Sequence, residues 1–293
     1  MNKPASSIVI IGCGDIGTQV AHHYLEKNQN LEALVRSEDS LNKLQTLGIK
    51  TQQADLATPF QLQLNTAGCK LFHFAPPPRE GKEDIHTRNL ITALRAVSSP
   101  PSRIVYISTT GVYGDCQGSW VDEDAPVNPQ VDRARRRYHA EQQLLEYGTD
   151  SGTDIVILRV AGIYGPGKLP LKRISEGHPV IRKEESPYTN RIHSSDLVKI
   201  ALAAMDKWRH GAIYHACDGN PGTMAEYFSA VANKAGLPRP PEISLAEGNE
   251  KLSSGMMSYM RESRRLSNKK TLTELEIILD FPDLLQGLEH CNI

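Results

Sequence analysis

Three glycines with the spacing G-x-G-x-x-G stand near the start of the chain, at Gly12, Gly14 and Gly17. The apolar run Ile8–Ile11 precedes them and the amphipathic run Thr18–Leu25 follows, which is the context that a nucleotide-binding turn requires. Gly12 would allow a tight turn, Gly14 would let backbone N–H groups approach a pyrophosphate, and Gly17 would let the helix pack close to the strand. We therefore expect this helix N-terminus to bind phosphates, the alternative being a purely structural turn.

A second apolar run, Leu31–Val35, ends at Arg36 and Ser37, about twenty residues beyond the glycines, where an NAD site offers an acid to the ribose hydroxyls. An acid there would repel a 2′-phosphate, whereas an arginine attracts it and can bond two of its oxygens. The sequence therefore favours NADP over NAD as the cofactor. The alternative interpretation of Arg36 is a solvated charge at the end of a strand.

The composition is that of an ordinary globular protein of 293 residues, with 39% hydrophobic and 23% charged residues. Because the formal net charge is −1, no global field draws the chain to nucleic acid or to an anionic membrane. Neither a leader pattern nor an apolar run long enough to cross a bilayer stands out. We expect a cytoplasmic protein that binds neither nucleic acid nor a membrane.

The cysteines and histidines do not predict a metal site. The five cysteines are far apart and form no C-x-x-C pair, which argues against a zinc site and against a disulfide framework. The ten histidines show no metal-ligand spacing beyond the adjacent His22 and His23, which would point in different directions on a helix. We expect no metal.

Short apolar strands alternate with helical patterns, which predicts a parallel sheet with right-handed crossovers. The expected strands are Ile8–Ile11, Leu31–Val35, Lys50–Gln53, Lys70–Phe74, Arg103–Ile107, Asp154–Arg159 and Ala212–Ala216. The expected helices between and after them include Asp39–Leu47, Asp84–Ala96, Val131–Tyr147, Ser195–Met205 and Met224–Ala235. Ligands gather at the carboxyl ends of such strands, so we look for chemistry just after Phe74, Ile107 and Arg159.

Several motifs in order along the chain resemble those of the extended short-chain dehydrogenase/reductases, the NAD-dependent epimerase/dehydratase family, and particularly an atypical branch of it. They are the glycine motif at 12–17, Asp55, STTGVYGD at 108–115, LRVAGIYGPG at 158–167, RIHSSDL at 191–197 and YHACDGNP at 214–221. The resemblance covers nearly the whole chain. It implies an α/β fold, a Rossmann-type doubly wound parallel sheet with a smaller C-terminal substrate-binding cap.

The resemblance also implies roles for individual residues. Thr109 takes the position whose hydroxyl bonds the substrate oxygen, and Asp55 the position that contacts the adenine. The family's catalytic tyrosine and lysine, counted back from Ala140 and Glu141, fall on Arg133 and Arg137, so the usual Tyr-x-x-x-Lys dyad is absent. Arg137 could still hold the ribose hydroxyls, but Arg133 is a poor acid or base. The expected cofactor-binding residues are Gly12, Gly14, Asp15, Ile16, Gly17, Arg36, Ser37, Asp55, Leu56, Phe74, Ala75 and Arg137.

The arginine run at 133, 135, 136 and 137 has two interpretations. One is a solvated helix face. The other has Arg133 and Arg137 on one face, pointing toward the cofactor or an anionic substrate. Tyr138 is a poor substitute for the missing tyrosine, because it lies roughly 140° around the helix from position 133. Other proton donors considered are His193, Tyr113 and Tyr164, of which Tyr113 is interpreted as a packed aromatic residue.

The expected organisation is an NAD(P)-binding Rossmann domain at 1–165 plus 190–218, and a smaller substrate-binding region at 166–189 plus 219–293. The resemblance implies a homodimer formed through Asp84–Ala96 and Val131–Tyr147. We expect an NADP-dependent oxidoreductase or epimerase-like enzyme for a small carbonyl or sugar-type substrate, with Thr109 and Arg137 as catalytic residues. The alternative is a catalytically inactive dinucleotide-binding sensor, which the missing dyad favours.

Overall fold

The computed structural model describes residues 7–97, 99–207 and 210–291, and the chain divides into two compact units. The first unit consists of Met1–Val112, Asp132–Arg159 and Ile200–Tyr214. The second consists of Tyr113–Val131, Val160–Lys199 and His215–Ile293. The nucleotide-binding turn belongs to the first unit and the segment after Pro221 to the second.

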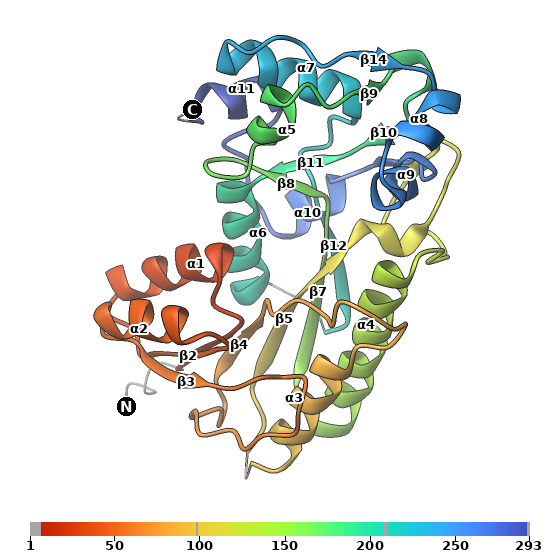
Figure 1. Ribbon diagram of the computed structural model, residues 1–293. Coiled ribbons are helices and arrows are strands. Elements are labelled where there is room, and N and C mark those ends of the chain that lie inside the picture. The colour runs from red at the N-terminus through yellow and green to blue at the C-terminus, as the bar shows by residue number, and fades with distance from the viewer. Residues whose placement is uncertain (1–6, 98, 208–209, 292–293) are drawn as a thin grey trace. The chain divides into compact units, whose positions relative to one another are not determined.

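The first unit is built on a seven-stranded sheet with the strand order β12-β7-β5-β4-β1-β2-β3 (Figure 1). The strands are β1 (Ile8–Ile11), β2 (Leu31–Val35), β3 (Lys50–Gln53), β4 (Lys70–His73), β5 (Arg103–Thr109), β7 (Asp154–Val160) and β12 (Ala212–Ala216). The pairs from β3 through β2, β1 and β4 to β5 are parallel. The order reverses direction at β1, which confirms the expected doubly wound α/β fold.

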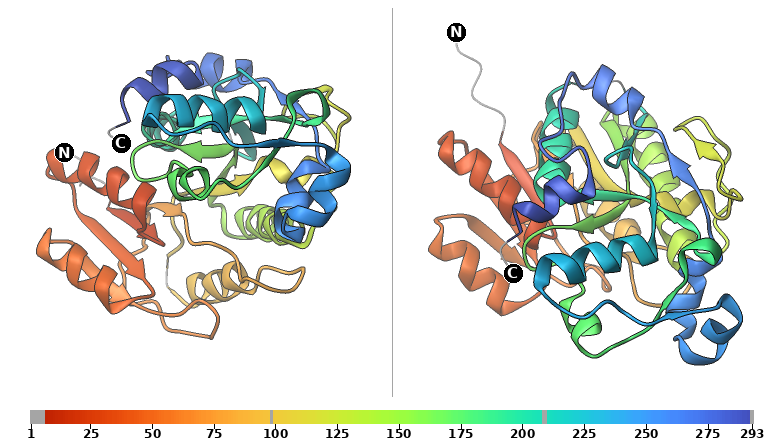
Figure 2. Two further views of the ribbon diagram at one scale, coloured as in Figure 1. Left: turned by 45° about the horizontal axis from the view of Figure 1, so that its top comes forward. Right: turned by 90° about the horizontal axis from the view of Figure 1, so that it is seen from above.

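Helices cover both faces of this sheet, because β1 is apolar on both sides. All four residues of β1 are buried. α1 (Asp15–Glu26) packs on one face, where Tyr24 contacts the ring of Phe72. α3 (Ile85–Arg95) and α4 (Asp132–Ser151) lie together on the other face, where Val9 and Ile11 join their core (Figures 1 and 2). Alternation along a strand explains the division, since successive side chains point to opposite faces.

The remaining helices of the first unit are α2 (Glu38–Thr46) and the carboxyl half of α6 (Ser194–Asp206). α2 follows β2 and contacts β2 and β3. The Ser37 hydroxyl caps its N-terminus by accepting a hydrogen bond from the Ser40 N–H at 3.3 Å. The cap fixes the backbone directly after Arg36.

The second unit contains small two-stranded sheets, whose strands have two or three residues each, rather than one large sheet. β8 (Gly162–Tyr164) pairs with β11 (Arg191–His193), β10 (Tyr188–Thr189) with β13 (Gly222–Thr223), β9 (Val180–Ile181) with β14 (Glu242–Ile243), and β6 (Trp120–Val121) with β15 (Arg265–Leu266). Its helices are α5 (Leu171–Ser175), α7 (Met224–Ala235), α8 (Leu245–Lys251), α9 (Ser254–Met260), α10 (Lys269–Glu274) and α11 (Leu284–Glu289), with the 3₁₀ turn η2 (Lys183–Glu185). The 3₁₀ turn η1 (Thr110–Tyr113) belongs to the first unit except for its last residue. Tyr164, Tyr227, Phe228 and Val231 belong to its core.

The compact units have different boundaries from those expected from the sequence. Tyr113–Val131 and residues 160–165, 190–199 and 215–218 belong to the second unit, whereas the sequence analysis assigned them to the nucleotide-binding region. The reason is that β8 and β11, which follow the large sheet's strand β7 and precede α6, pair with each other. The role of the second unit in substrate binding stays a prediction.

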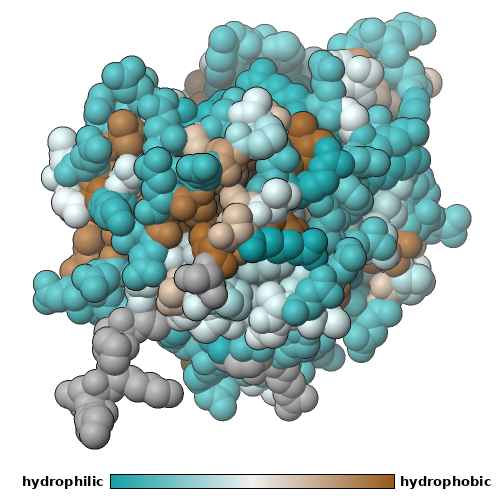
Figure 3. Space-filling model, turned by 90° about the horizontal axis from the view of Figure 1, so that it is seen from below, coloured by the Kyte–Doolittle hydropathy of each residue, from teal (hydrophilic) through white to brown (hydrophobic). Residues whose placement is uncertain are grey.

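The surface view in Figure 3 shows a face on which hydrophilic residues predominate and hydrophobic residues gather in smaller patches. Apolar side chains are otherwise concentrated in the cores described above. None of the helices within the described residues has the length and apolarity needed to cross a bilayer.

Candidate functional site

The turn between β1 and α1 has the backbone geometry that its glycines predict. Gly12 has φ +83°, and a Cβ there would lie 2.4 Å from the backbone nitrogen of Ala75. A Cβ at Gly17 would lie 3.2 Å from Ile10 Cγ2, so the helix runs close to β1. A Cβ at Gly14 would meet no described heavy atom within 4 Å. The turn is therefore closed on the side of Gly12 and Gly17 and open at Gly14.

The N-terminus of α1 has donors to offer at this opening. Gly14 is the N-cap residue, and no side chain caps the helix. N–H groups in the first turn of a helix lack intrahelical partners, and they suit an anion such as a phosphate. Ile16 is buried, whereas Asp15 is exposed and accepts a hydrogen bond from Gln19 at 3.3 Å.

A cavity of about 320 Å³ opens beside this turn, within the first unit. It is lined by Gly12, Cys13, Gly14, Leu34, Val35, Arg36, Ser37, Ser40, Ala54, Asp55, Leu56, Phe74, Ala75, Pro76 and His86. Most of the expected cofactor-binding residues are in this set. Asp15, Ile16, Gly17 and Arg137 are not among the lining residues. The cavity therefore lies at the carboxyl ends of β1, β2, β3 and β4, whose following residues line it.

Arg36 stands at the mouth of this cavity with its side chain uncommitted. The residue is exposed, and the described residues place no carboxylate in ion-pair contact with it. Its backbone is fixed, because Arg36 O accepts a hydrogen bond from Gln53 Nε2 at 3.0 Å. Asp55 is also exposed, and its Oδ1 accepts the Ala57 N–H at 2.9 Å, which orients the carboxylate.

His86 is a lining residue that the sequence did not indicate. It lies in α3, and its Nδ1 donates to Pro76 O at 2.9 Å, since a carbonyl can only accept. The bond ties α3 to the proline segment after β4. A single histidine in a helix gives no sequence signal for such a contact, because the contact depends on the path of the chain between Pro78 and the start of α3.

Thr109 ends β5, and its hydroxyl keeps a proton to donate. Thr109 Oγ1 accepts the Gly111 N–H at 3.2 Å. Gly111 in turn lies against α4, since a Cβ there would be 3.6 Å from Ala134 Cβ. β5 runs two residues beyond the expected end at Ile107, because Ser108 and Thr109 continue the strand without continuing its apolar pattern.

Arg137 reaches from α4 to the carboxyl end of the same strand. Its Nη1 donates to Ile107 O at 2.8 Å and to the Tyr106 hydroxyl at 3.2 Å, and its guanidinium carbon lies 5.7 Å from the centre of the Tyr106 ring. The structure thus brings Arg137 and the Thr109 strand together. Tyr106 was missed as its partner, although strand alternation places Tyr106 and Ser108 on the face that α4 covers.

The other arginines of the run have separate environments, so the run is not one solvated helix face. Arg136 is buried and donates to Gly81 O. Arg135 is half-exposed and pairs with Asp132 at 2.8 Å. Arg133 lies partly buried in the first full turn of α4.

A buried ionic network fixes α4 to the sheet. Glu141 forms an ion pair of 2.9 Å with Arg159 of β7 and accepts a hydrogen bond from the Ser108 hydroxyl. All three side chains are almost fully buried. A buried charge pair of this kind is costly to break, because removal of one partner leaves the other uncompensated. The network holds the helix that carries Arg137 in register with β5.

The last residue of β4, His73, is a buried histidine with a lowered pKa. His73 is buried, and its Nε2 lies 2.9 Å from Thr87 Oγ1, which donates to Asp84 at 3.1 Å. Burial lowers the pKa of His73 to about 3, with smaller contributions from Arg137 and His86. The imidazole is therefore uncharged at neutral pH, and Arg137 is the cation of this region.

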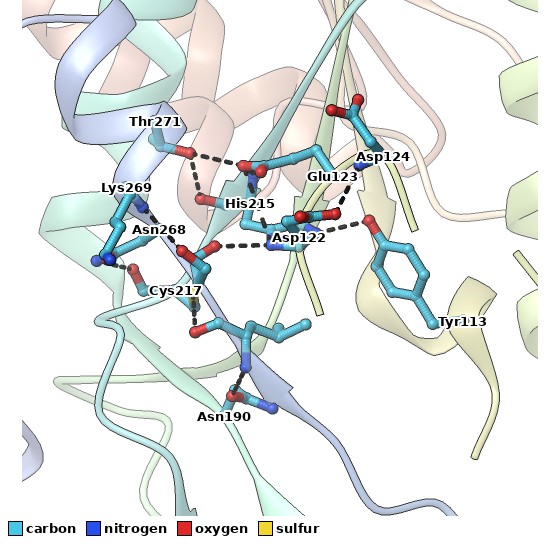
Figure 4. Close-up of polar contacts among 12 residues, drawn as sticks. Tyr113, Asp122, Glu123, Asp124, Asn190, His215, Cys217, Asn268, Lys269 and Thr271 are labelled. Atoms are coloured by element: carbon cyan, nitrogen blue, oxygen red, sulfur yellow. Dashed lines mark hydrogen bonds and ion pairs between the residues drawn. The ribbon is translucent and has the colours of Figure 1, made fainter. Parts of the chain in front are cut away.

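Tyr106 and Tyr113 are both buried tyrosines. Tyr106 is fully buried, and burial raises the pKa of its phenol to about 12, against the opposing effect of Arg137. In the second unit, the hydroxyl of Tyr113 lies 2.6 Å from His215 Nε2, and both side chains are buried (Figure 4). In a neutral ring His215 Nδ1 donates to Ser267 O at 2.8 Å, so Nε2 accepts the Tyr113 proton.

The buried surroundings of Tyr113 and His193 argue against proton transfer from either of them. Glu123 accepts the His215 backbone N–H at 2.9 Å, which holds the partner of Tyr113 in place (Figure 4). His193 is buried against Phe281, and its Nδ1 accepts the Ser195 N–H at 3.3 Å. Burial lowers the pKa of His193. In the described part of the chain, no three or more His, Cys, Asp and Glu side chains group as a metal site.

Comparisons with known proteins agree with this architecture. The chain is 32% identical to protein YeeZ of Escherichia coli (strain K12) over 155 residues, which are 52% of this chain and 54% of that protein. The chain thus spans about half the length of this curated relative. Among solved structures, a functionally unknown conserved protein from Silicibacter pomeroyi DSS is 26% identical, with a TM-score of 0.84 and 97% of both chains covered.

A second solved structure is MoeE5 in complex with UDP-glucose and NAD, which is 21% identical, with a TM-score of 0.74 and 97% of both chains covered. At this identity the likeness shows the fold alone. The model of the NAD dependent epimerase/dehydratase family matches residues 80–217, which include Thr109, the α4 arginines and β7. This match spans 138 of the 293 residues, a little under half of the chain, and makes residues 80–217 similar to the NAD dependent epimerase/dehydratase family.

Proposed function

We propose that this protein is an NADP-dependent oxidoreductase or epimerase-like enzyme that acts on a small carbonyl or sugar-type substrate. The observation that carries the proposal is the cradle in the first unit, where the space at Gly14 opens beside a cavity of about 320 Å³ that Arg36 lines. A diphosphate at the uncapped N-terminus of α1 and an adenosine in the cavity fit this arrangement.

Arg36 supports NADP over NAD. Its exposed guanidinium at the cavity mouth can bond a 2′-phosphate with two parallel hydrogen bonds. The carboxylate of Asp55, oriented by the Ala57 N–H, is placed to accept from an adenine amino group. The family name and the NAD complex of MoeE5 support a nicotinamide dinucleotide without distinguishing the two forms.

Thr109 and Arg137 are the residues to which we assign the chemistry. A nicotinamide dinucleotide, when bound, supplies or removes a hydride. The Thr109 hydroxyl accepts from Gly111 and donates to the substrate oxygen, which polarises it. Arg137 has further N–H donors beyond those that Ile107 and Tyr106 occupy, and these can hold ribose hydroxyls. Because arginine does not release a proton at neutral pH, the role that we assign to Arg137 is binding and not proton transfer.

An absorbance assay tests the proposal by following NADPH oxidation against a panel of carbonyls and nucleotide sugars. We expect turnover with at least one class, and a loss of at least about tenfold in kcat for Thr109→Val, with NADPH affinity unchanged. Val matches the shape of Thr and lacks only the hydroxyl. The matched control is Thr92→Val in α3, where the hydroxyl donates to Arg88 O on an exposed face.

The second candidate function is a dinucleotide-binding sensor that reports the state of the cofactor to a partner. The arginines at positions 133 and 137, in place of a Tyr/Lys dyad, favour it. Tight NADPH binding without turnover across the whole panel would support the sensor and contradict the enzyme. For either function we keep the homodimer through α3 and α4 as a prediction.

A further inference from the structure

Arg191 of β11 is a half-buried cation whose described partners are all neutral. Its Nη1 donates to Asn190 O at 3.2 Å, and its Nη2 lies 3.4 Å from Met224 Sδ, a weak acceptor. Its Nε is buried without a hydrogen-bond partner. The guanidinium lies 4.3 Å from the centre of the Tyr227 ring. This contact holds one face of the plane and leaves the edge with its N–H donors for another group.

The nearby carboxylate does not neutralise Arg191. Asp218 Oδ1 accepts the Asn220 N–H at 2.9 Å, and its Oδ2 has no hydrogen-bond partner. Burial raises the pKa of Asp218 to about 7, so this group is only a fractional countercharge at neutral pH. Burial also lowers the pKa of Arg191, while Tyr227 and Asp218 act in the opposite direction. A buried cation in this state gains from an added anion.

Gly162 gives the guanidinium its room. The β8–β11 register pairs Arg191 with Gly162, and a Cβ at Gly162 would lie 2.5 Å from Arg191 Nη1. Gly162 is itself exposed, so Arg191 Nη1 packs against a residue at the surface. Any other residue here would displace the guanidinium.

Two other arginines with little exposure have carboxylate partners, whereas the buried Arg136 donates to the backbone oxygen of Gly81. Arg159 pairs with Glu141 at 2.9 Å and Arg264 with Glu262 at 3.0 Å. The N-terminal turn of α7 beside Arg191 does not compete as an anion site, because the capping box of Thr223 and Glu226 uses its donors. The arginine is therefore the donor that an anion would meet.

We propose that Arg191 binds an anionic oxygen group, a carboxylate or a phosphate, of the small molecule that the second unit takes. The planar fork of a guanidinium matches both groups with two parallel hydrogen bonds. The proposal deepens the proposed function by giving its substrate an anionic group, and it rests on that function only in calling this molecule the substrate. Binding of the anion itself requires no turnover.

Calorimetric titration of the full chain with inorganic phosphate and, separately, with malonate tests the proposal. We expect saturable binding of at least one anion, weakened at least about tenfold in Arg191→Gln. Gly162→Ala keeps the charge but pushes the guanidinium away, and we expect a similar loss. The control is Arg265→Gln, which removes an arginine stacked on the exposed rings of Trp120 and Tyr188 and should leave anion binding unchanged.

The two anions separate a carboxylate substrate from a phosphate substrate, and NADPH titrations of the same variants separate this inference from the proposed function. Loss of anion binding in Arg191→Gln and Gly162→Ala supports the proposal even if the chain binds no NADPH. The proposal is overturned if the wild-type chain binds neither anion, or if both variants bind as the wild type does. It is also overturned if binding is lost in Arg36→Gln alone, since that anion occupies the nucleotide cradle.

Discussion

The proposed preference for NADP over NAD rests on Arg36. Replacement by glutamine keeps much of the side-chain volume and removes the charge at the cavity mouth. Hydrogen bonds to charged groups contribute about 1.5–3 kcal/mol, so we expect NADPH to bind roughly tenfold to a hundredfold more weakly, with NADH affinity nearly unchanged. Arg95→Gln, an equal charge change at an exposed ion pair with Asp150, is the control. Equal losses for both nucleotides would contradict the role of Arg36.

Substitution of Arg137 tests whether the arginine run has a functional role or only a structural one. Arg137→Met keeps a long apolar chain but removes the donors to Ile107 and Tyr106. We expect NADPH affinity to fall by about tenfold, because the ribose loses its donor. Arg135→Met removes an exposed partner of Asp132 and should change little, since such pairs contribute about 0–1 kcal/mol. Unchanged affinity in a folded Arg137→Met protein would leave only a structural role.

Asp218 predicts a pH dependence of stability. Its pKa is raised to about 7 in the folded chain, from 3.8, so between these values the folded state holds a proton that the unfolded state has released. Stability from this group is therefore present at low pH and is lost as the pH rises toward 7. From pH 5 to pH 8 the loss is on the order of 2–3 kcal/mol, at about 1.4 kcal/mol per pKa unit.

Thermal unfolding at pH 5 and pH 8 measures this effect. Asp218→Asn keeps an oxygen to accept the Asn220 N–H and cannot titrate. The variant should lose less stability than the wild type between the two pH values. Parallel losses in the two proteins would show that Asp218 does not titrate in this range.

At the scale of elements, we expect substitutions at two glycines of the β1–α1 turn to have different effects, one on cofactor affinity and the other on stability. Gly14→Ala adds a methyl group in open space, so the chain should fold with unchanged Tm but bind NADPH at least about tenfold more weakly, because the methyl group occupies the phosphate approach. Gly12→Ala combines φ +83° with a clash at Ala75 and should cost roughly 1–3 kcal/mol of stability. Wild-type NADPH affinity in Gly14→Ala would contradict a phosphate site at this turn.

Most strands of the large sheet could be predicted because they are mainly buried apolar runs of several residues between breakers; β3, with the polar sequence KTQQ, is the exception. No such signal marks the end of β5, where Ser108 and Thr109 extend the strand with hydroxyl side chains. In the second unit the strands β6, β9, β10 and β13–β15 have two residues each, too few to carry a periodicity. Their pairing depends on the tertiary structure.

The candidate site was predictable where motif spacing fixes the backbone and unpredictable where contacts are distant in sequence. The glycine turn and Arg36 follow from local spacing. The contact of Arg136 with Gly81 and that of Arg137 with Tyr106 join residues 55 and 31 positions apart. The same limit applies to Arg191, whose unusual state is visible only once Gly162 and Tyr227 are placed around it.

At the scale of the whole molecule, the two compact units divide the proposed tasks. The nucleotide cradle, Thr109 and Arg137 all lie in the first unit, and the anion-binding arginine lies in the second. Variants in the cradle should therefore change NADPH affinity without changing anion binding at Arg191. Each unit has its own core, so the two sets of variants can be examined in the intact chain.

Calorimetric titration of the intact chain with NADPH and with NADH tests the central claim most directly. The account predicts saturable binding of NADPH at one site per chain, tighter than that of NADH, and loss of both in Gly14→Ala. Absence of binding of both nucleotides to the folded wild-type chain would contradict it.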